Sequence, residues 1–189
     1  MPNNLDNTLK AAIGSMENTI IPALNKENPL ASEQAALIVK LFRFLRERVP
    51  YVQQRDWLEL KIYSEMVAEL SDDIALLLPG NVVENTKIVM KEVGEVLAAP
   101  TPELGLLEQL AEELRFTLSE LIRASQDEED KLRTRIESVI VLGSKRVLDL
   151  QQAWFVPNGE AVVSDSIPNL GGQIRTESAR VPITSDTTN

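Results

Sequence analysis

The chain has 189 residues, enough for one domain with a sizeable core, and its 43% hydrophobic but only 4% aromatic content favours helices packed on helices over a β-sandwich. The formal net charge of −10 argues against a general nucleic-acid-binding protein, because such proteins bind largely by neutralising phosphates. The sequence contains no His and no Cys, which excludes disulfides and thiolate chemistry and leaves only carboxylates, Lys, Tyr, Ser or Thr for any catalysis.

Two helices are predicted in the first fifty residues. Apolar residues at helical spacing run from about residue 5 to residue 24, where Pro22 predicts a kink or an early stop because it lacks an amide donor. A second helix, residues 30–48, follows a turn, with Asn28 or Ser32 as its N-cap. We expect the buried side of this second helix to consist of Ala35, Ile38, Leu41, Phe42, Leu45 and Val49.

Pro50 separates the second helix from a third. The second helix either stops there, because the residue before a proline avoids helical angles, or continues with a kink. The third helix, residues 58–78, has apolar residues at alternating three- and four-residue steps, with acidic residues largely outside this stripe. Such a helix must pack on other helices, so we expect the fold to be organised around it. The stripe consists of Leu60, Tyr63, Val67, Leu70, Ile74 and Leu77, widened by Trp57, Ile62 and Met66.

Three more helices are predicted, at residues 82–98, 102–124 and 126–153. Gly143 lies inside the last of them, where glycine costs about 1 kcal/mol relative to alanine, and it indicates a close helix crossing. The first two helices carry apolar residues beyond one narrow stripe, which predicts either burial at the centre of the bundle or a partner interface. These additional residues are Val82, Val89, Val96, Leu106, Leu110 and Phe116.

The C-terminal residues 157–189 are rich in Ser, Thr, Asn, Pro and Gly and show no sustained period. Such a segment cannot bury enough surface to order itself, so we expect an extended or flexible tail after a folded part at residues 1–156. The predicted fold is therefore all-α, with about six helices in a mostly antiparallel up-and-down bundle and an irregular C-terminal tail.

A basic corner around the junction of the second and third helices is the main candidate binding site. Arg43, Arg46 and Arg55 lie among aromatic residues, and guanidinium groups bind phosphate well. They predict a site for a phosphorylated small molecule of the nucleotide or acyl-CoA type. We favour the simpler interpretation that the basic residues stabilise the C-terminal end of their helix and pair with the neighbouring acids Glu47 and Asp56.

Clusters of acidic residues are a second candidate site. They lie on the predicted helices at 102–124, 126–153 and 58–78, and helical nucleotide pyrophosphatases hold magnesium with carboxylates at such spacing. We favour a solvated face and helix-dipole stabilisation instead, and we predict no metal site and no cofactor. The residues are Glu108, Glu112 and Glu113; Asp127, Glu128, Glu129 and Asp130; and Glu65, Glu69 and Asp72.

The first quarter of the chain resembles a known helical domain. The segments 20–24 (IIPAL) and 30–39 (LASEQAALIV) are similar to a bacterial helical domain of unknown function. That domain is often encoded beside acyl-CoA dehydrogenases and a phosphotransferase-like kinase. The resemblance implies an accessory role rather than a catalytic one, and it assigns no functional residue.

From these patterns we expect a non-catalytic accessory or protein-interaction protein that self-associates or binds a protein partner. The alternative is a binder or enzyme for a phosphorylated small molecule, acting through the corner at 43–55 or the acidic faces. No apolar run approaches the about 18 residues needed to span a bilayer, and the N-terminus lacks the charged start and apolar core of a signal peptide. We therefore expect a cytoplasmic protein that binds neither nucleic acid nor membrane.

Overall fold

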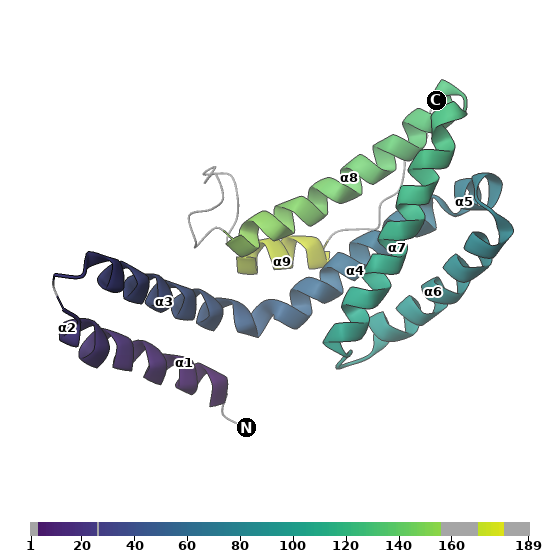
Figure 1. Cartoon of the computed structure of the whole chain (residues 1–189). Coiled ribbons are helices and arrows are strands. Elements are labelled where there is room, and N and C mark those ends of the chain that lie inside the picture. The colour runs from purple at the N-terminus through teal and green to yellow at the C-terminus, as the bar shows by residue number, and fades with distance from the viewer. Residues whose placement is uncertain (1–3, 26, 156–169, 180–189) are drawn as a thin grey trace. The chain divides into compact units, whose positions relative to one another are not determined.

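The computed structural model describes residues 4–25, 27–155 and 170–179 (Figure 1). Every regular element within these ranges is helical, which confirms the prediction of an all-α fold. The described residues form two compact units. The first comprises the described residues up to Val52 together with Trp154 and Phe155, and the second comprises residues 53–153 together with helix α9.

The first unit begins with a helix that widens before a proline. Helix α1 (Asn4–Ser15) is followed by the π-helical turn η1 (Met16–Ile20) and the short α2 (Ile21–Ala23). The amide of Ile21 donates to the carbonyl of Met16, five residues earlier, just before Pro22, which has no amide hydrogen to donate. Leu24 is extended, so the helix ends close to Pro22, in line with the predicted early stop.

Helix α3 (Pro29–Arg48) runs back along α1 (Figure 1). Asn28 caps its N-terminus, which was one of the two predicted caps: the side-chain oxygen of Asn28 accepts a hydrogen bond from the amide of Ala31 at 3.1 Å. The buried contact between the two helices is small. It consists of Leu9 and Ile13 from α1 and Ala35 and Val39 from α3.

The helical path continues through Pro50. The 3-10 turn η2 (Val49–Tyr51) follows α3 directly, and α4 (Val52–Glu69) follows η2. Proline is tolerated in the first turn of a helix, where its missing amide hydrogen has no carbonyl to bond, and Pro50 lies in that part of η2. Helix α3 ends at Arg48, as the predicted stop before Pro50 requires, and the 3-10 turn leads directly into α4, so the outcome lies between the two predicted alternatives.

The second unit contains long helices that reverse direction from one to the next (Figure 1). The predicted third helix is interrupted at Leu70, so that a short helix follows α4. Together with α1 to α3, the elements of this unit account for the six helices expected from the sequence. They are α4, α5 (Ser71–Leu77), α6 (Gly80–Ala98), α7 (Leu104–Ala124), the 3-10 turn η3 (Ser125–Asp127) and α8 (Asp130–Phe155).

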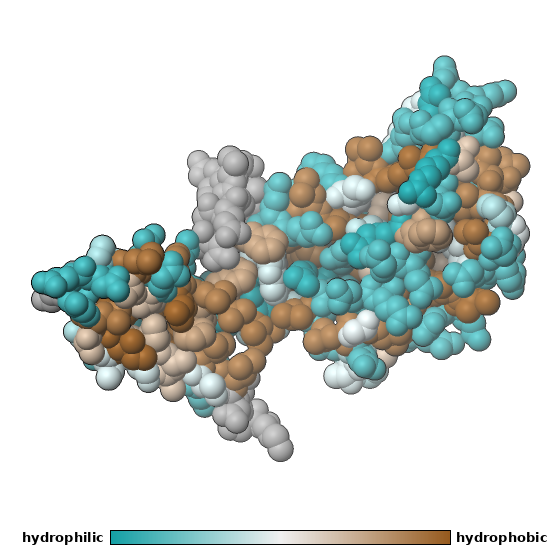
Figure 2. Space-filling view, viewed as in Figure 1, coloured by the Kyte–Doolittle hydropathy of each residue, from teal (hydrophilic) through white to brown (hydrophobic). Residues whose placement is uncertain are grey.

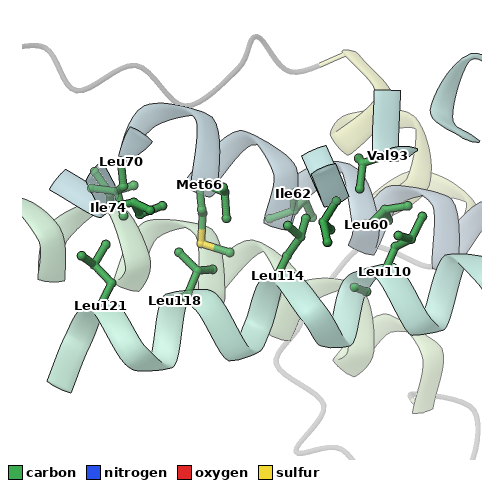
Figure 3. Close-up of a cluster of buried hydrophobic side chains, with 14 of the residues drawn as sticks. Leu60, Ile62, Met66, Leu70, Ile74, Val93, Leu110, Leu114, Leu118 and Leu121 are labelled. Carbon is green, nitrogen blue, oxygen red and sulfur yellow. The ribbon is translucent and has the colours of Figure 1, made fainter. Parts of the chain in front are cut away.

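A leucine-rich seam between α4–α5 and α7 forms the centre of the second unit (Figure 3). The predicted stripe supplies one side of it: most of its members are buried, while Tyr63 and Leu77 are half-buried and pack against the same cluster. Val93 of α6 and Ile136 of α8 close the cluster from other helices. The facing residues are Leu60, Ile62, Met66, Leu70 and Ile74 on one side and Leu110, Leu114, Leu118 and Leu121 on the other.

Burial at the centre of the unit explains the broad apolar faces of α6 and α7. Val89, Val96 and Leu110 are buried in the cluster. Val82 and Leu106 are half-buried against it. Of the additional apolar residues on these two helices, Phe116 is the one that stays largely exposed, at 58%. The first of the two predicted alternatives, central burial, therefore accounts for most of this pattern.

The C-terminal segment differs from the expectation in one place. Residues 170–179, within the predicted irregular tail, form helix α9 (Leu170–Ala179), and its Ile174 and Glu177 are buried. A helix this short with few inward side chains gives no sustained period in the sequence. The segments 156–169 and 180–189 lie outside the described residues, so the division into a folded part at 1–156 and a tail at 157–189 stays a prediction.

Gly143 of α8 lies against Met66 of α4 with no room for a side chain, as the predicted close crossing requires. A Cβ on Gly143 would lie 2.5 Å from Met66 Cγ and closer still to its Sδ, and Met66 is fully buried. Gly94 of α6 is an interior helical glycine with open space around such a Cβ. We expect Gly143→Ala to lower the free energy of unfolding by about 1–3 kcal/mol. We expect Gly94→Ala to raise it by about 0.5–1 kcal/mol, and chemical denaturation measures both.

A third variant separates overpacking from other effects of the Gly143 substitution. In a Met66→Ala background the crossing has space for the new methyl group, so Gly143→Ala should lose most of its destabilising effect. Equal effects of Gly143→Ala and Gly94→Ala, or no change in the Met66→Ala background, would contradict the close crossing.

Candidate functional site

One helix of the first unit presents an apolar face that no described residue of that unit covers. The side chains of this face are between 37% and 63% exposed. Helix α1 covers the side of α3 that carries Ala35 and Val39, roughly a third of a turn away around the helix. Figure 2 shows hydrophobic side chains on the visible surface of this unit. The face consists of Leu30, Leu37, Ile38, Leu41 and Leu45, and we call it the α3 leucine face.

The predicted buried side of this helix is wrong in part. Ala35 is buried and Phe42 is half-buried, but Ile38, Leu41 and Leu45 are exposed. The sequence shows correctly that α3 is apolar on more than one side. A unit built on two main helices buries only the side of each helix that faces the other, and periodicity alone does not tell which side that is.

Two arginines of the predicted basic corner lie in the first unit, where they tie α3 to α1 and η1. Arg43 Nη2 lies 2.5 Å from Glu17 Oε1, and Arg46 Nε lies 2.6 Å from Asp6 Oδ1. Hydrogen bonds from Lys10 and from Arg46 lower the pKa of Asp6. These exposed ion pairs are of a weak kind, but a phosphate bound here would have to displace the carboxylates.

Arg55, the third arginine of the predicted site, lies in the second unit and lines a small pocket between α4 and α7. Its Nη2 lies 2.6 Å from Asp56 Oδ1. Arg115 lines the same pocket, which has a volume of about 170 Å³, together with Glu59 and Glu108. Burial raises the pKa of the Glu59 carboxyl, although Arg115 and Arg55 favour its charged form.

The size and charge of this pocket limit what it can bind. Pockets for drug-sized ligands have volumes of about 300–1,000 Å³, so this one is too small for such a ligand and suits a group of about the size of a phosphate ion or a benzene ring. Its carboxylates also offset the charge of its two arginines. The structure therefore places Arg55 in one pocket with Arg115, a residue outside the predicted basic corner, and phosphate binding at Arg43, Arg46 and Arg55 stays a prediction.

The acidic residues of the predicted clusters mostly pair locally or face solvent. Glu112 pairs with Arg115 one turn along α7, and Asp130 pairs with Arg133 at 2.5 Å. Asp127, Glu128 and Glu129 are exposed. Within the ranges that the structure describes, no group of three or more acidic residues is arranged to hold a metal ion. Over the same ranges, no helix combines the length and the hydropathy of a membrane span.

A buried ion-pair network joins three helices of the second unit. Arg146 of α8 donates from Nη1 to Glu65 Oε2 of α4 at 2.8 Å, and from Nε to Glu177 Oε2 of α9 at 2.9 Å. All three residues are buried. Although burial opposes the charge, hydrogen bonds to Glu65 and Glu177 raise the pKa of Arg146. The network holds α9 against the body of the unit.

The sequence pattern does not predict this network, because it puts Glu65 on an acidic face and Glu177 in the irregular tail. A signal was present in α8, where Arg146 follows Gly143 by three positions and precedes Leu150 by four, so it lies on the buried stripe of that helix. A charge on a buried stripe requires a buried counter-charge, but the pattern does not say which residues supply it.

Comparisons with known proteins assign no family to the chain. It matches no protein-family model, and neither a curated protein nor a solved structure shows significant similarity to it. The resemblance of residues 20–24 and 30–39 to a bacterial helical domain therefore stays a prediction.

Removing the cation from the buried network should destabilise the second unit strongly. Arg146→Met leaves Glu65 and Glu177 buried without the guanidinium, and we expect the free energy of unfolding to fall by about 3–5 kcal/mol. The neighbouring Lys145 makes an exposed pair with Asp149 at 2.8 Å. Lys145→Met should therefore change the free energy by no more than about 0.5 kcal/mol.

Hydrogen exchange measured on the same variants tests the connection to α9. Because Glu177 is held by Arg146, the amides of α9 should exchange faster in Arg146→Met and at the parent rate in Lys145→Met. Equal stability of the two variants, together with equal protection of the α9 amides, would show that the network does not hold α9 in place.

Proposed function

We propose that this protein is a non-catalytic accessory or interaction protein that self-associates through the α3 leucine face. The observation that supports the proposal is the row of exposed leucine-type side chains on one helix of the first unit. Contiguous apolar patches on soluble proteins generally mark a binding surface. The missing His and Cys, which remove the commonest catalytic groups, support the non-catalytic part of the proposal.

Exposed apolar residues elsewhere are more scattered. In the second unit they occur on four helices, and single exposed apolar side chains are ordinary on protein surfaces. On α3 they recur at steps of three, four and seven residues, so they line one side of the helix. A row of this kind fits against an apolar row of another helix. The scattered residues are Leu76, Ile88, Leu104, Phe116, Val141, Leu142 and Leu148.

Charged substitutions on the face test the proposal. Sedimentation velocity should show the parent protein associating as its concentration rises. Leu37→Glu/Leu41→Glu should be monomeric at the same concentrations, because association would bury carboxylates without partners. The matched control is Ala36→Glu, which adds a carboxylate to an exposed position on another side of α3 and should associate like the parent.

Circular dichroism and thermal unfolding of the three proteins show whether the substitutions leave the fold intact, as expected for exposed positions. The proposal fails if the parent stays monomeric up to its solubility limit. It also fails if Leu37→Glu/Leu41→Glu associates as strongly as the parent.

The second candidate function is the binding of a small phosphorylated ligand, and the pocket that Arg55 and Arg115 share supports it. Inorganic phosphate is the probe that matches the pocket volume of about 170 Å³. If it binds, phosphate at 100 times its dissociation constant should stabilise the protein by about 2.7 kcal/mol and raise its melting temperature. Arg55→Gln should abolish the rise, and Arg123→Gln, which alters an exposed ion pair with Glu120, should not. No rise in the parent protein would exclude this candidate.

A further inference from the structure

We propose that the α3 leucine face pairs with the same face of a second copy in antiparallel orientation, with Glu33 of each copy opposite Lys40 of the other. The inference rests on the proposed self-association and adds to it the orientation, the register and the polar residues that select them.

The α3 leucine face has the spacing of a short coiled-coil seam. Written in heptads, Leu30 and Leu37 occupy position d, and Gln34 and Leu41 occupy position a. Ile38 adds to the seam from the neighbouring position e. Because a seam of a and d residues packs into the matching seam of another helix, the occupant that this pattern fits best is an α-helix with the same spacing.

Contacts within the first unit occupy the C-terminal end of the seam, so this end is not available to a second helix. The next d and a positions are Phe44 and Arg48, and both contact the end of α8. The Phe44 ring packs edge-on against Trp154 with the ring centroids 6.4 Å apart. The Arg48 Nε donates to the Trp154 carbonyl at 2.8 Å. The open seam therefore runs from Leu30 to Leu41.

The charges beside the open seam are self-complementary. Glu33 and Lys40 are exposed, occupy successive g positions and carry opposite charge. In an antiparallel pair, g positions face each other. Placing Leu41 opposite Leu30 of the second copy sets Glu33 opposite Lys40, and the two-fold symmetry of the pair repeats this contact. Both flanking contacts are then attractive, and the apolar contacts use only the open seam.

Other arrangements of the same two helices lack this match. A shift by one heptad sets Lys40 opposite Lys40 and Glu33 opposite Glu47, and it needs Phe44 in the seam. A parallel pair sets Glu33 beside Ile38, without a facing charge. Exposed ion pairs contribute little to affinity, but they discriminate among registers whose apolar contacts are similar. Gln34 also restricts the register, because a polar residue in the seam of a helix pair is tolerated in few alignments of the two helices.

The size of the face indicates a weak dimer. Stable interfaces bury about 800 Å² on each partner, and the five partly exposed side chains of the α3 leucine face supply only part of such an area. We therefore expect a dimer that dissociates on dilution, which makes its affinity measurable by sedimentation.

Charge exchange on the full-length chain tests the arrangement. Glu33→Lys and Lys40→Glu should each weaken dimerisation about tenfold or more, because both flanking contacts become repulsive. Glu33→Lys/Lys40→Glu should dimerise like the parent, since the exchanged charges still face their opposites. An equimolar mixture of the two single variants should form heterodimers, detected by native mass spectrometry, in preference to either homodimer. Ser32→Lys, at an exposed position away from the seam, is the control and should match the parent.

The outcomes separate this inference from the proposed function. The arrangement is overturned if the single variants dimerise like the parent, or if the double exchange does not restore dimerisation. In that case a loss of association in Leu37→Glu/Leu41→Glu would still support the face itself. A parent protein that is monomeric at all concentrations overturns both.

Discussion

The packing of leucines from α4 and α5 against those of α7 is the contact on which the second unit depends. Further helices enclose it, with Val93 from α6 and Ile136 from α8, so the apolar residues at its centre are buried. The first unit has no comparable enclosure among its described residues: α3 has α1 beside it and the end of α8 at its own C-terminus. The apolar side chains of a helix are therefore buried in the second unit and partly exposed in the first, because the helices of the second unit have more neighbouring helices.

Buried charge serves a different purpose from buried leucine in this chain. The network of Glu65, Arg146 and Glu177 removes three charged groups from water, and the cost of this offsets much of their attraction. Its geometry suits a positioning role. Ile174 and Glu177 are buried residues of α9, and the pairing of Glu177 with Arg146 joins this helix to α8. Arg135 of α8 similarly fixes α5, since it donates to both oxygens of the buried Asp73 at 2.8 and 2.7 Å.

Apolar periodicity predicted the helices well, because burial of one stripe is a local property of a helix. It predicted the members of the central seam from Leu60 to Ile74, and a single glycine predicted the close crossing at Gly143. Periodicity did not predict burial correctly where burial depends on which other elements lie next to the helix. Leu41 and Leu107 are both leucines at helical spacing, yet the first is half-exposed and the second is fully buried. The partners of Arg146 could not be predicted for the same reason, because they come from residues 81 positions before it and 31 positions after it in the sequence.

Gln34 gives a reason to regard the α3 leucine face as a surface that meets another helix and not as an unfinished core. It lies in the middle of the face, where a residue selected only for burial would be apolar. A polar side chain there weakens association and limits the number of registers in which two helices can meet. In the proposed pair, the charges of Glu33 and Lys40 beside it would restrict the register in the same way. Leucines that supply attraction, together with polar groups that restrict orientation, are what a reversible and specific helix pair requires, since affinity and selectivity then come from different residues.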